Sequence, residues 1–515
     1  MFGSRRPRVL AALCAALAIA LLASCARVVS AATEGDSPAA DASGSGKKPN
    51  IVYVLTDDLA WNLVEYMPHV RQMRKEGATF TNFFATDSLC CPSRTSLLTG
   101  QYPHNTGVFT NTGDDGGYGA FMKNRNEEKT FGPALQRAGY RTGFMGKYLN
   151  GYQPADKNGT SKPYLPSGWD EWDVAGDGYP EYTYDLNENG EVVPYGKAPQ
   201  DYLTDVLSKK ATSFIGSSAA AKKPFMLEVA TFAPHGPATP APRDKDTFPG
   251  LKAPRTDAYD KATRNAPKWQ RSLSALTAKE QEETDRKFAK RVRSVQAVDA
   301  MIGQLEKTLE EKGLADDTYL VFGSDNGFHM GEHRLRPGKQ TAYDTDVKVP
   351  MMVTGPGVPA GEKVSRLAEN VDINPTFLDL AGVEPPSTVD GHSLGDLMHG
   401  RTEDEWRQAV LVEHHHATSK KGDPDAAPKD SGDPPTYAAM RTDDSLYVEY
   451  ADGEREFYAL GSDPDQLTNR AASLSAAQRA ALHHTLTALQ RWAKAPMRRS
   501  VSREKGRRSS LAWDA

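Results

Sequence analysis

The stretch IVYVLTDD at residues 51–58 decides the fold. It is a continuous apolar run followed by a threonine and two acids, and such a run is typical of a strand buried on both faces. Two similar runs occur at residues 225–230 and 319–322. The clearest helical pattern lies between them, with apolar side chains three and four residues apart over residues 295–309. This alternation of strands and helices predicts an α/β fold with a mainly parallel sheet.

Length and charge restrict the class of protein. The 515 residues are enough for a substantial core and more than one domain. The 62 Lys and Arg residues nearly balance the 67 Asp and Glu residues, giving a net charge of −5. A dedicated nucleic-acid binder carries a basic excess, so we expect no nucleic-acid partner. Only four cysteines are present and two of them are adjacent, which excludes a disulfide scaffold.

The N-terminus has the pattern of an export signal over residues 1–32: arginines, an apolar run at 9–23, then small residues. The run is shorter than the roughly 20 apolar residues of a membrane span. It ends in Leu-Ala-Ser-Cys, which resembles the lipobox of bacterial lipoproteins, with Cys25 as the lipidated residue. Ordinary signal-peptide cleavage near residues 29–31 is the alternative. We therefore expect an exported protein, either a cell-surface lipoprotein anchored only through Cys25 or a secreted one, with a flexible linker at 33–48.

From about residue 405 the alternation of buried strands and helices gives way to several short strands followed by a helix. This change predicts a main domain at 49–404 and a smaller α+β subdomain at 405–495. A helix is predicted at 476–492, and the antiparallel strands of the subdomain are predicted at residues 436–440, 446–450 and 456–460. The polar, proline-broken stretch 240–290 is expected to be a surface insertion. The basic tail at 496–515 has the composition of a solvated chain end.

Oxygen ligands follow two of the three predicted strands. Asp57 and Asp58 follow the first strand, and Asp325 and Asn326 follow the third. In open parallel sheets ligands bind beyond the carboxyl ends of strands, so these side chains could converge. Carboxylates packed together repel unless a cation lies among them, and oxygen donors of this kind favour Ca²⁺ or Mg²⁺. Acids after a strand are also common as turn and helix-cap residues, so the pattern alone does not establish a metal site.

The segment LCCPSRTSLLTG at residues 89–100 lies between these strands in the sequence. Pro92 suits the first turn of a helix and Gly100 suits its end, which would set Cys90 and Cys91 at a helix N-terminus, where backbone N–H groups favour anions. A pair of small, buried apolar side chains before a helix would have the same composition.

This segment resembles the signature of the sulfatase family, Cys-x-Pro-Ser-Arg followed by Leu-Leu-Thr-Gly. The pattern requires proline two residues and arginine four residues after the reactive cysteine, which Cys90 satisfies through Pro92 and Arg94 and Cys91 does not. The resemblance is strongest to the N-acetylglucosamine-6-sulfatase and arylsulfatase branch. It spans residues 48–470, with further motifs at 100–104, 146–148, 233–235, 338–341, 372–376 and 457–460.

The resemblance implies an alkaline-phosphatase-like fold, with a large, mainly parallel mixed sheet sandwiched by helices. It implies hydrolysis of sulfate monoesters, either aryl sulfates or sulfated sugars such as N-acetylglucosamine 6-sulfate. In this family a formylglycine-generating enzyme acts on the unfolded chain and converts the signature cysteine to formylglycine, an aldehyde whose hydrate is the nucleophile. Carried over to this sequence, the modified residue is Cys90, and the ligands of Ca²⁺, or of Mg²⁺, are Asp57, Asp58, Cys90, Asp325 and Asn326.

The resemblance also implies a set of catalytic cations. Arg94 would orient the hydrate, and Lys147, His235 and Lys339 match positions for sulfate binding and proton transfer. Negative charge gathers on the bridging oxygen as the S–O bond breaks, so fixed cations and a proton donor would lower the barrier.

One departure from the family pattern follows Lys147. Many arylsulfatases have histidine two residues after this lysine, whereas Leu149 and then Asn150 stand here. We expect Asn150, His329 and His333 to contribute to the substrate pocket, although loop histidines without a role fit the sequence equally well. The His414-His415-His416 triplet is expected at a strand end or on the surface rather than around a metal.

Two other functions remain open. Relatives with the same modified cysteine hydrolyse phosphonate monoesters or phosphodiesters. Those relatives have a motif like Asp-His-Gly after the corresponding strand, whereas this chain has Asp-Asn-Gly, with Asn326 in the middle position. A surface protein that binds sulfated glycans without catalysis is less compatible with the full set of Cys90, Arg94, Lys147, His235 and Lys339.

Overall fold

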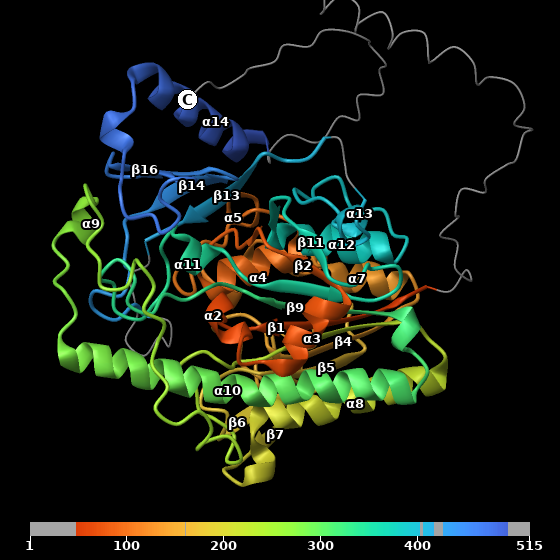
Figure 1. Cartoon of the computed structure of the whole chain (residues 1–515). Coiled ribbons are helices and arrows are strands. Elements are labelled where there is room, and N and C mark those ends of the chain that lie inside the picture. The colour runs from red at the N-terminus through yellow and green to blue at the C-terminus, as the bar shows by residue number, and fades with distance from the viewer. Residues whose placement is uncertain (1–47, 160, 402–404, 417–425, 493–515) are drawn as a thin grey trace, which may run out of the picture. The chain divides into compact units, whose positions relative to one another are not determined.

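The structure is a computed structural model that describes residues 48–159, 161–401, 405–416 and 426–492 (Figure 1). The predicted export signal with Cys25, nearly all of the linker, and the basic tail lie outside the described residues. None of the described helices is long and apolar enough to cross a membrane.

A ten-stranded mixed sheet is the centre of the fold, in the order β11-β2-β10-β9-β1-β8-β4-β5-β6-β7. Strand β1 (Asn50–Thr56) lies between β9 (Thr318–Ser324) and β8 (Phe225–Ala230), and both neighbours run parallel to it. The three apolar runs of the sequence are thus adjacent central strands, which confirms the predicted α/β class.

The side chains of β1 alternate between two cores, as strand geometry requires. Ile51, Tyr53 and Leu55 pack in one core, and Val52 and Val54 pack in the other. All five are at most 1% exposed. Burial stabilises each such side chain by about 1.5–3 kcal/mol, which explains why a continuous apolar run occupies the middle of the sheet.

Helices cover both faces of the sheet (Figure 1). One core contains side chains of α3 (Pro68–Glu76), α8 (Leu203–Ala221) and α10 (Ala278–Glu311). The opposite core contains side chains of α4 (Cys90–Thr99), α7 (Phe131–Arg137) and α12 (Ile373–Leu380).

Helix α10 is longer than the sequence pattern indicated. It begins at Ala278, so the expected surface insertion at 240–290 ends about a dozen residues earlier than predicted. The helix begins after Thr277, whose hydroxyl accepts from the Glu280 N–H while the Glu280 carboxylate accepts from Thr277. This capping box starts the helix. Only the part of the insertion before residue 278 lies outside α10.

Short strands with mixed composition complete the sheet. Strands β4, β8, β1 and β9 are mutually parallel, whereas β10 runs antiparallel to β9, and β6 antiparallel to both β5 and β7. Their bounds are β2 (Ala78–Phe80), β4 (Arg141–Lys147), β5 (Glu171–Ala175), β6 (Tyr184–Glu188), β7 (Glu191–Tyr195), β10 (Met351–Thr354) and β11 (Glu362–Val364). The shorter elements are α2 (Trp61–Val64), β3 (Phe83–Phe84), α5 (Pro103–Thr106), α6 (Gly117–Lys123), α9 (Lys268–Arg271), α11 (Asp344–Val347), β12 (Ala368–Glu369) and α13 (Gly395–Met398).

The C-terminal part forms a separate antiparallel sheet, as predicted, followed by α14 (Ala476–Trp492). Its strands are β13 (Ala409–His414), β14 (Tyr437–Thr442), β15 (Ser445–Tyr450) and β16 (Arg455–Ala459). Strand β13 was not anticipated. This sheet shares a core with the preceding chain, because Val410 and Tyr458 pack in one cluster with Tyr343.

Candidate active site

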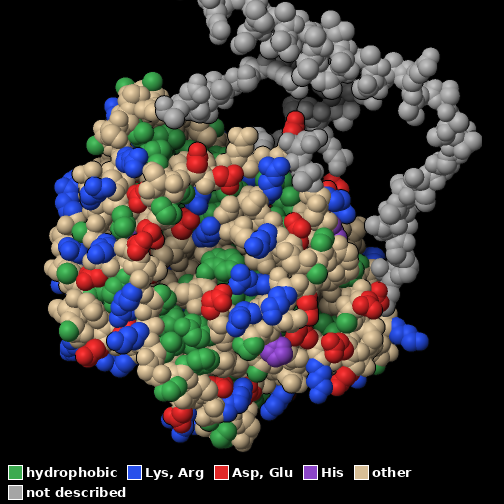
Figure 2. Space-filling model, viewed as in Figure 1, with side chains coloured by type: hydrophobic (Ala, Val, Ile, Leu, Met, Phe, Trp, Pro, Cys, Tyr) green, Lys and Arg blue, Asp and Glu red, His purple; other side chains and the backbone are tan. Residues whose placement is uncertain are grey.

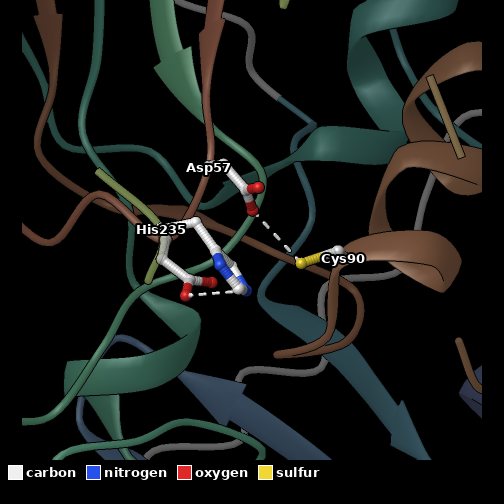
Figure 3. A group of neighbouring side chains, drawn as sticks. Asp57, Cys90 and His235 are labelled. Atoms are coloured by element: carbon white, nitrogen blue, oxygen red, sulfur yellow. Dashed lines mark hydrogen bonds and ion pairs between the residues drawn. The ribbon is translucent and has the colours of Figure 1, made fainter. Parts of the chain in front are cut away.

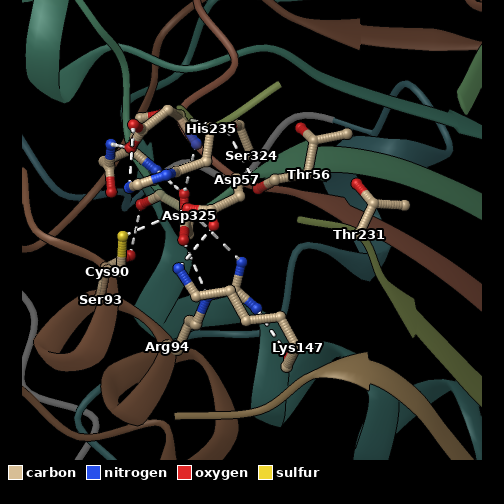
Figure 4. Close-up of polar contacts among 12 residues, drawn as sticks. Thr56, Asp57, Cys90, Ser93, Arg94, Lys147, Thr231, His235, Ser324 and Asp325 are labelled. Atoms are coloured by element: carbon tan, nitrogen blue, oxygen red, sulfur yellow. Dashed lines mark hydrogen bonds and ion pairs between the residues drawn. The ribbon is translucent and has the colours of Figure 1, made fainter. Parts of the chain in front are cut away.

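The carboxyl ends of β1 and β9 bring the predicted oxygen ligands together (Figure 4). The strand register pairs Thr56 with Ser324. The next residues of the two strands, Asp57 and Asp325, are therefore neighbours, and the Asp58 N–H donates to Asp325 Oδ1 at 3.1 Å. Asn326 is likewise buried, and its Nδ2 donates to Asp58 Oδ1 at 2.7 Å.

Cys90 is the first residue of α4, two residues earlier than the predicted helix start at Pro92. Its Sγ donates to Asp57 Oδ1 at 3.2 Å (Figure 3), and Lys339 Nζ donates to the same sulfur at 2.8 Å. Gly100 ends the helix in the left-handed region, with φ of 70°. The thiol of Cys90 therefore lies among carboxylates and a cation.

The neighbouring Cys91 has different surroundings. It packs in the apolar core on the α4 side of the sheet, and burial raises the pKa of its thiol to about 12. The two cysteines are not joined by a disulfide. Proline spacing in the sequence had separated their roles, and the structure separates their environments.

Each carboxylate in the cluster has a cationic partner. Lys147 Nζ, at the end of β4, lies 2.5 Å from Asp57 Oδ2. Lys339 Nζ lies 2.7 Å from Asp58 Oδ1. Burial alone would raise the pKa of the Asp57 carboxyl, but the surrounding cations, Lys147 above all, hold that pKa well below its usual value.

Arg94 extends from α4 beneath the cluster. Its Nε donates to Asp325 Oδ2 at 2.8 Å, and its Nη1 donates to the Lys147 carbonyl oxygen at 3.0 Å. Burial would lower the pKa of Arg94, but Asp325 and Asp57 raise it above its ordinary value, so the guanidinium stays charged.

His235 follows β8 and approaches the cluster from the other side (Figure 3). Its Nε2 lies 3.7 Å from Asp58 Oδ2, and its Nδ1 lies 2.8 Å from the Gly236 carbonyl oxygen. The ring of Tyr179 contacts the His235 ring at a centroid separation of 4.6 Å and lies 4.9 Å from Lys147 Nζ. Tyr179 therefore packs against two of the predicted sulfate-side cations.

The cluster fits a hard divalent cation. Donor atoms of Asp57, Asp58, Cys90 and His235 all lie within 4.8 Å of one another. The side-chain carbonyl oxygen of Asn326 is buried and has no hydrogen-bond partner. Buried polar atoms are normally satisfied, so this oxygen is suited to a metal ligand.

Two assignments differ between the predicted ligand set and this geometry. The group of converging donors includes His235, which the sequence assigned to sulfate, and does not include Asp325. The Asp325 oxygens accept from Arg94 Nε and from the N–H groups of Asp58 and Asn326. Asp325 is nonetheless a buried carboxylate next to Asp57 and Asp58, so the ligand set of Asp57, Asp58, Cys90, Asp325 and Asn326 stays a prediction.

The three predicted pocket residues are all buried. Asn150 Nδ2 donates to the Tyr179 hydroxyl at 3.2 Å, which places it next to the cationic side of the site. His329 is fully buried between Asp346, 2.9 Å from its Nδ1, and the Arg336 carbonyl oxygen, 2.9 Å from its Nε2.

His333 stacks on Tyr343 at a centroid separation of 3.9 Å, and burial, with the nearby charge of His329, lowers its pKa to about 3. Neither His329 nor His333 lines the cavity described below. His329 thus holds the loop that carries Lys339, through the backbone of Arg336 and Gly338.

The histidine triplet does not form a shared site. His414, the last residue of β13, is paired with Asp87, whereas His415 is paired with Asp115 and His416 with Asp433. Each ring has its own carboxylate, as expected for strand-end and surface positions.

A cavity of about 630 Å³ opens on the cluster, with Asp58, His235 and Lys339 in its wall. Arg291 of α10 also lines it and donates to the backbone oxygens of Asp58 and Pro234. Sequence reasoning missed both Arg291 and Tyr179. The sequence held a signal for Arg291: it stands four residues before Val295, so it lies on the same face of α10 as the apolar residues and is expected to be buried.

The Sulfatase family model matches residues 49–383, which include every residue of this cluster. The chain belongs to the sulfatase family. A second model, N-sulphoglucosamine sulphohydrolase, C-terminal, matches residues 331–491.

Named relatives of this sulfatase are sulfuric ester hydrolases, which confirms the predicted enzyme class. The chain is 34% identical to human N-acetylglucosamine-6-sulfatase over 473 residues, covering 86% of this chain and 85% of that protein. It is 32% identical to an arylsulfatase of Volvox carteri, over 69% of this chain and 59% of that protein. It is 36% identical to the extracellular sulfatase SULF-1 homolog of Drosophila melanogaster. That match covers 71% of this chain and 33% of the Drosophila protein.

Solved structures confirm the alkaline-phosphatase-like fold. A protein in complex with its substrate D-glucosamine-2-N,6-O-disulfate aligns with a TM-score of 0.72 and 24% identity, over 87% of this chain and 98% of that one. The phosphonate monoester hydrolase of Agrobacterium radiobacter aligns with a TM-score of 0.66 and 21% identity, over 87% and 96%.

Proposed function

We propose that this sulfatase hydrolyses sulfate monoesters, either aryl sulfates or sulfated sugars such as N-acetylglucosamine 6-sulfate, through a formylglycine made from Cys90 and a bound Ca²⁺. The position of the Cys90 sulfur carries the proposal. It lies 3.2 Å from Asp57 and 2.8 Å from Lys339, and Lys339 lines a cavity that a substrate can enter. The similarity to N-acetylglucosamine-6-sulfatase and to an arylsulfatase supports this substrate range.

Asp57, Asp58, Asp325 and Asn326 would hold the Ca²⁺, together with the modified Cys90, and Asp325 also accepts from the Asp58 N–H and from Arg94. Bound Ca²⁺ and the aldehyde hydrate together supply an ionised oxygen nucleophile near pH 7. We propose that a formylglycine-generating enzyme makes this modification before the chain folds, since Cys90 is fully buried in the folded protein.

The fixed cations would bind and polarise the sulfate. Lys339 and His235 line the cavity, so an entering sulfate group meets them first. Lys147 and Arg94 lie deeper and are paired with Asp57 and Asp325. Positive charge held rigidly where negative charge develops needs no reorganisation during the reaction, which is the largest advantage such a site offers.

His235 is the best placed proton donor for the leaving oxygen. Its Nδ1 contacts the Gly236 carbonyl oxygen, which fixes the orientation of the ring, and its Nε2 is the nitrogen near Asp58. A donor with one nitrogen anchored and the other near the reacting group can transfer a proton directly.

Export supports access to such substrates. We propose that residues 1–32 direct the protein out of the cytoplasm, with Cys25 as a lipid anchor in the lipoprotein case. Mass analysis of the mature N-terminus separates the two forms, because only the lipoprotein begins at an acylated Cys25.

The proposal is tested by sulfate release from 4-nitrophenyl sulfate and N-acetylglucosamine 6-sulfate, with the adjacent cysteine as the matched control. Cys90→Ala should lose about 10⁴-fold or more of kcat/KM, because the nucleophile is gone. Cys91→Ala removes a neighbouring buried thiol of the same size and should keep activity within about threefold, since the small change stays in the apolar core. A Cys90→Ala variant with full turnover would refute the proposal.

The same preparation should be assayed with 4-nitrophenyl phosphate and a phenyl phosphonate monoester. We expect the sulfate ester to be the preferred substrate, because this chain has Asn326 at the position where the phosphonate hydrolases have the histidine of an Asp-His-Gly motif. A preference for the phosphorus esters would instead assign the protein to that activity.

A further inference from the structure

The cavity beside the catalytic cluster is much more basic than the protein as a whole. Seven Lys or Arg side chains line it, against three acids. The whole chain has a net charge of −5, and on the face shown in Figure 2 basic and acidic side chains are interspersed. A hollow lined by one sign of charge concentrates ligands of the opposite sign.

One face of α10 supplies the centre of this basic wall. Lys287, Lys290 and Arg291 all line the cavity and stand three and four residues apart, so they are neighbours on one helix face. Arg291 is committed to the backbone oxygens of Asp58 and Pro234. Within the described residues, Lys287 and Lys290 make neither an ion pair nor a side-chain hydrogen bond.

Two other cations along the same helix, Arg286 and Lys307, form ion pairs. Arg286 lies 3.8 Å from both Glu282 and Glu283, and Lys307 lies 3.8 Å from Glu311. Like charges three and four residues apart destabilise a helix. Arg291 repels Lys287, Glu283 one turn earlier attracts it, and a bound anion would add to that attraction.

The sulfate ester being cleaved does not need these lysines. It carries one negative charge, and Lys147, His235 and Lys339 already converge on the catalytic cluster. Lys287 and Lys290 thus represent surplus positive charge in the same cavity.

We propose that Lys287 and Lys290 form a subsite for a second anionic group of the substrate, a sulfate or a carboxylate, that lies beyond the ester undergoing cleavage. This inference rests on the proposed function and assigns its substrate class: sugars that carry at least two anionic groups. An aryl monosulfate would occupy only the catalytic end of the cavity.

The experiment compares substrates that differ in the second anion. Wild-type enzyme and the Lys287→Ala/Lys290→Ala double variant are assayed with N-acetylglucosamine 6-sulfate, with glucosamine 2-N,6-O-disulfate, and with a 6-sulfated glucosamine disaccharide that carries a uronate carboxylate. Lys279→Ala is the control, because Lys279 is an exposed lysine of the same helix that does not line the cavity.

The double variant should lose about tenfold of kcat/KM on at least one substrate with a second anion, chiefly through KM, and should change by less than about twofold on the monosulfate. The dianionic substrate that loses most identifies the second group as sulfate or carboxylate. Lys287→Arg/Lys290→Arg should restore most of the loss, and raising the salt from about 0.05 M to about 0.5 M should weaken the wild-type preference because the lysines are exposed.

Binding to the Cys90→Ala variant gives a readout that does not depend on turnover. Isothermal titration with glucosamine 2-N,6-O-disulfate and with the uronate disaccharide should show a weaker Kd once both lysines are replaced. Equal effects on all three substrates, or no effect on any, would overturn the subsite while leaving the sulfatase activity intact. Absence of sulfate release from every ester by wild-type enzyme would instead contradict the proposed function.

Discussion

Two charged regions meet in one cavity, and they are built in opposite ways. In the catalytic cluster Asp57 is fully buried and Lys147 is 2% exposed, and the two are held together at 2.5 Å. On the α10 face Lys287 and Lys290 are exposed and form no ion pair or side-chain hydrogen bond with another described residue. This difference separates chemistry, which needs fixed charges, from selectivity, which needs charges that a ligand can still reach.

The energetics of the two regions should differ accordingly. Removing one partner of a buried ion pair leaves an uncompensated charge and costs about 3–5 kcal/mol, whereas exposed charges contribute about 0–1 kcal/mol. Substitutions in the cluster should therefore affect every substrate, and those on α10 only some of them.

Removal of the metal is expected to have the largest effect. Incubation with EGTA followed by gel filtration should lower sulfatase activity by more than about 100-fold, and added Ca²⁺ should restore it. The melting temperature should fall as well, because Asp57, Asp58 and Asp325 then repel one another without a divalent ion. Full activity in protein shown by elemental analysis to contain no divalent metal would contradict the Ca²⁺ assignment.

The loss of a single cluster cation should follow in size. Lys339→Ala should reduce kcat/KM by about 10²–10³-fold on all sulfate esters, since Lys339 contacts both Cys90 and Asp58. Lys287→Ala should stay within about threefold on 4-nitrophenyl sulfate. Similar losses for the two variants on this monosulfate would erase the distinction between the regions.

Tyr179 should show an intermediate effect that depends on its ring. Tyr179→Phe keeps the packing on His235 and Lys147 and loses the hydroxyl that accepts from Asn150, so we expect about a threefold loss of kcat/KM. Tyr179→Leu loses the aromatic face and should cost about 30-fold, with a shift in the pH–rate profile because the surroundings of His235 change. An unchanged profile in the leucine variant would assign Tyr179 to packing alone.

Glu228 offers a test of buried charge that does not involve catalysis. This β8 side chain is 1% exposed, and burial raises its pKa to about 8, although Arg94 opposes the shift. The folded protein keeps the proton where the unfolded chain, with a pKa of about 4.3, releases it, so stability must fall as pH rises between these values. Glu228→Gln lacks this decline.

In urea unfolding at pH 5.5, 6.5 and 7.5, the stability gap in favour of Glu228→Gln should therefore widen by up to about 1.4 kcal/mol per pH unit. A gap that stays constant over this range would show that Glu228 is already ionised in the folded protein.

The meeting of the oxygen donors at one edge of the sheet could be predicted for a simple reason. Residues such as Asp57 and Asp325 follow parallel strands, and parallel strands align their ends, so strand prediction alone brings them together. The position of Cys90 followed from proline spacing, which the helix start at Cys90 bears out within two residues.

Features set by long-range packing were harder to anticipate. Strands β4 to β7 are mixed in composition, and β5, β6 and β7 have only five residues each, so no periodic pattern revealed them. The burial of His329 against Asp346 depends on how one loop folds back, which local sequence does not encode. The part of α10 that lines the cavity was also missed. It belongs to the helix that starts at the Thr277 capping box, and the sequence around Thr277 is polar like that of a loop.

The chemical state of Cys90 in the active enzyme tests the central claim most directly. Purified protein with measured sulfatase turnover is digested, and the peptide with residues 89–94 is weighed by mass spectrometry. Conversion of the thiol to an aldehyde predicts a mass about 18 Da below the cysteine form, in a fraction that tracks specific activity across preparations. Fully active protein in which this peptide carries only the unmodified thiol would contradict the account.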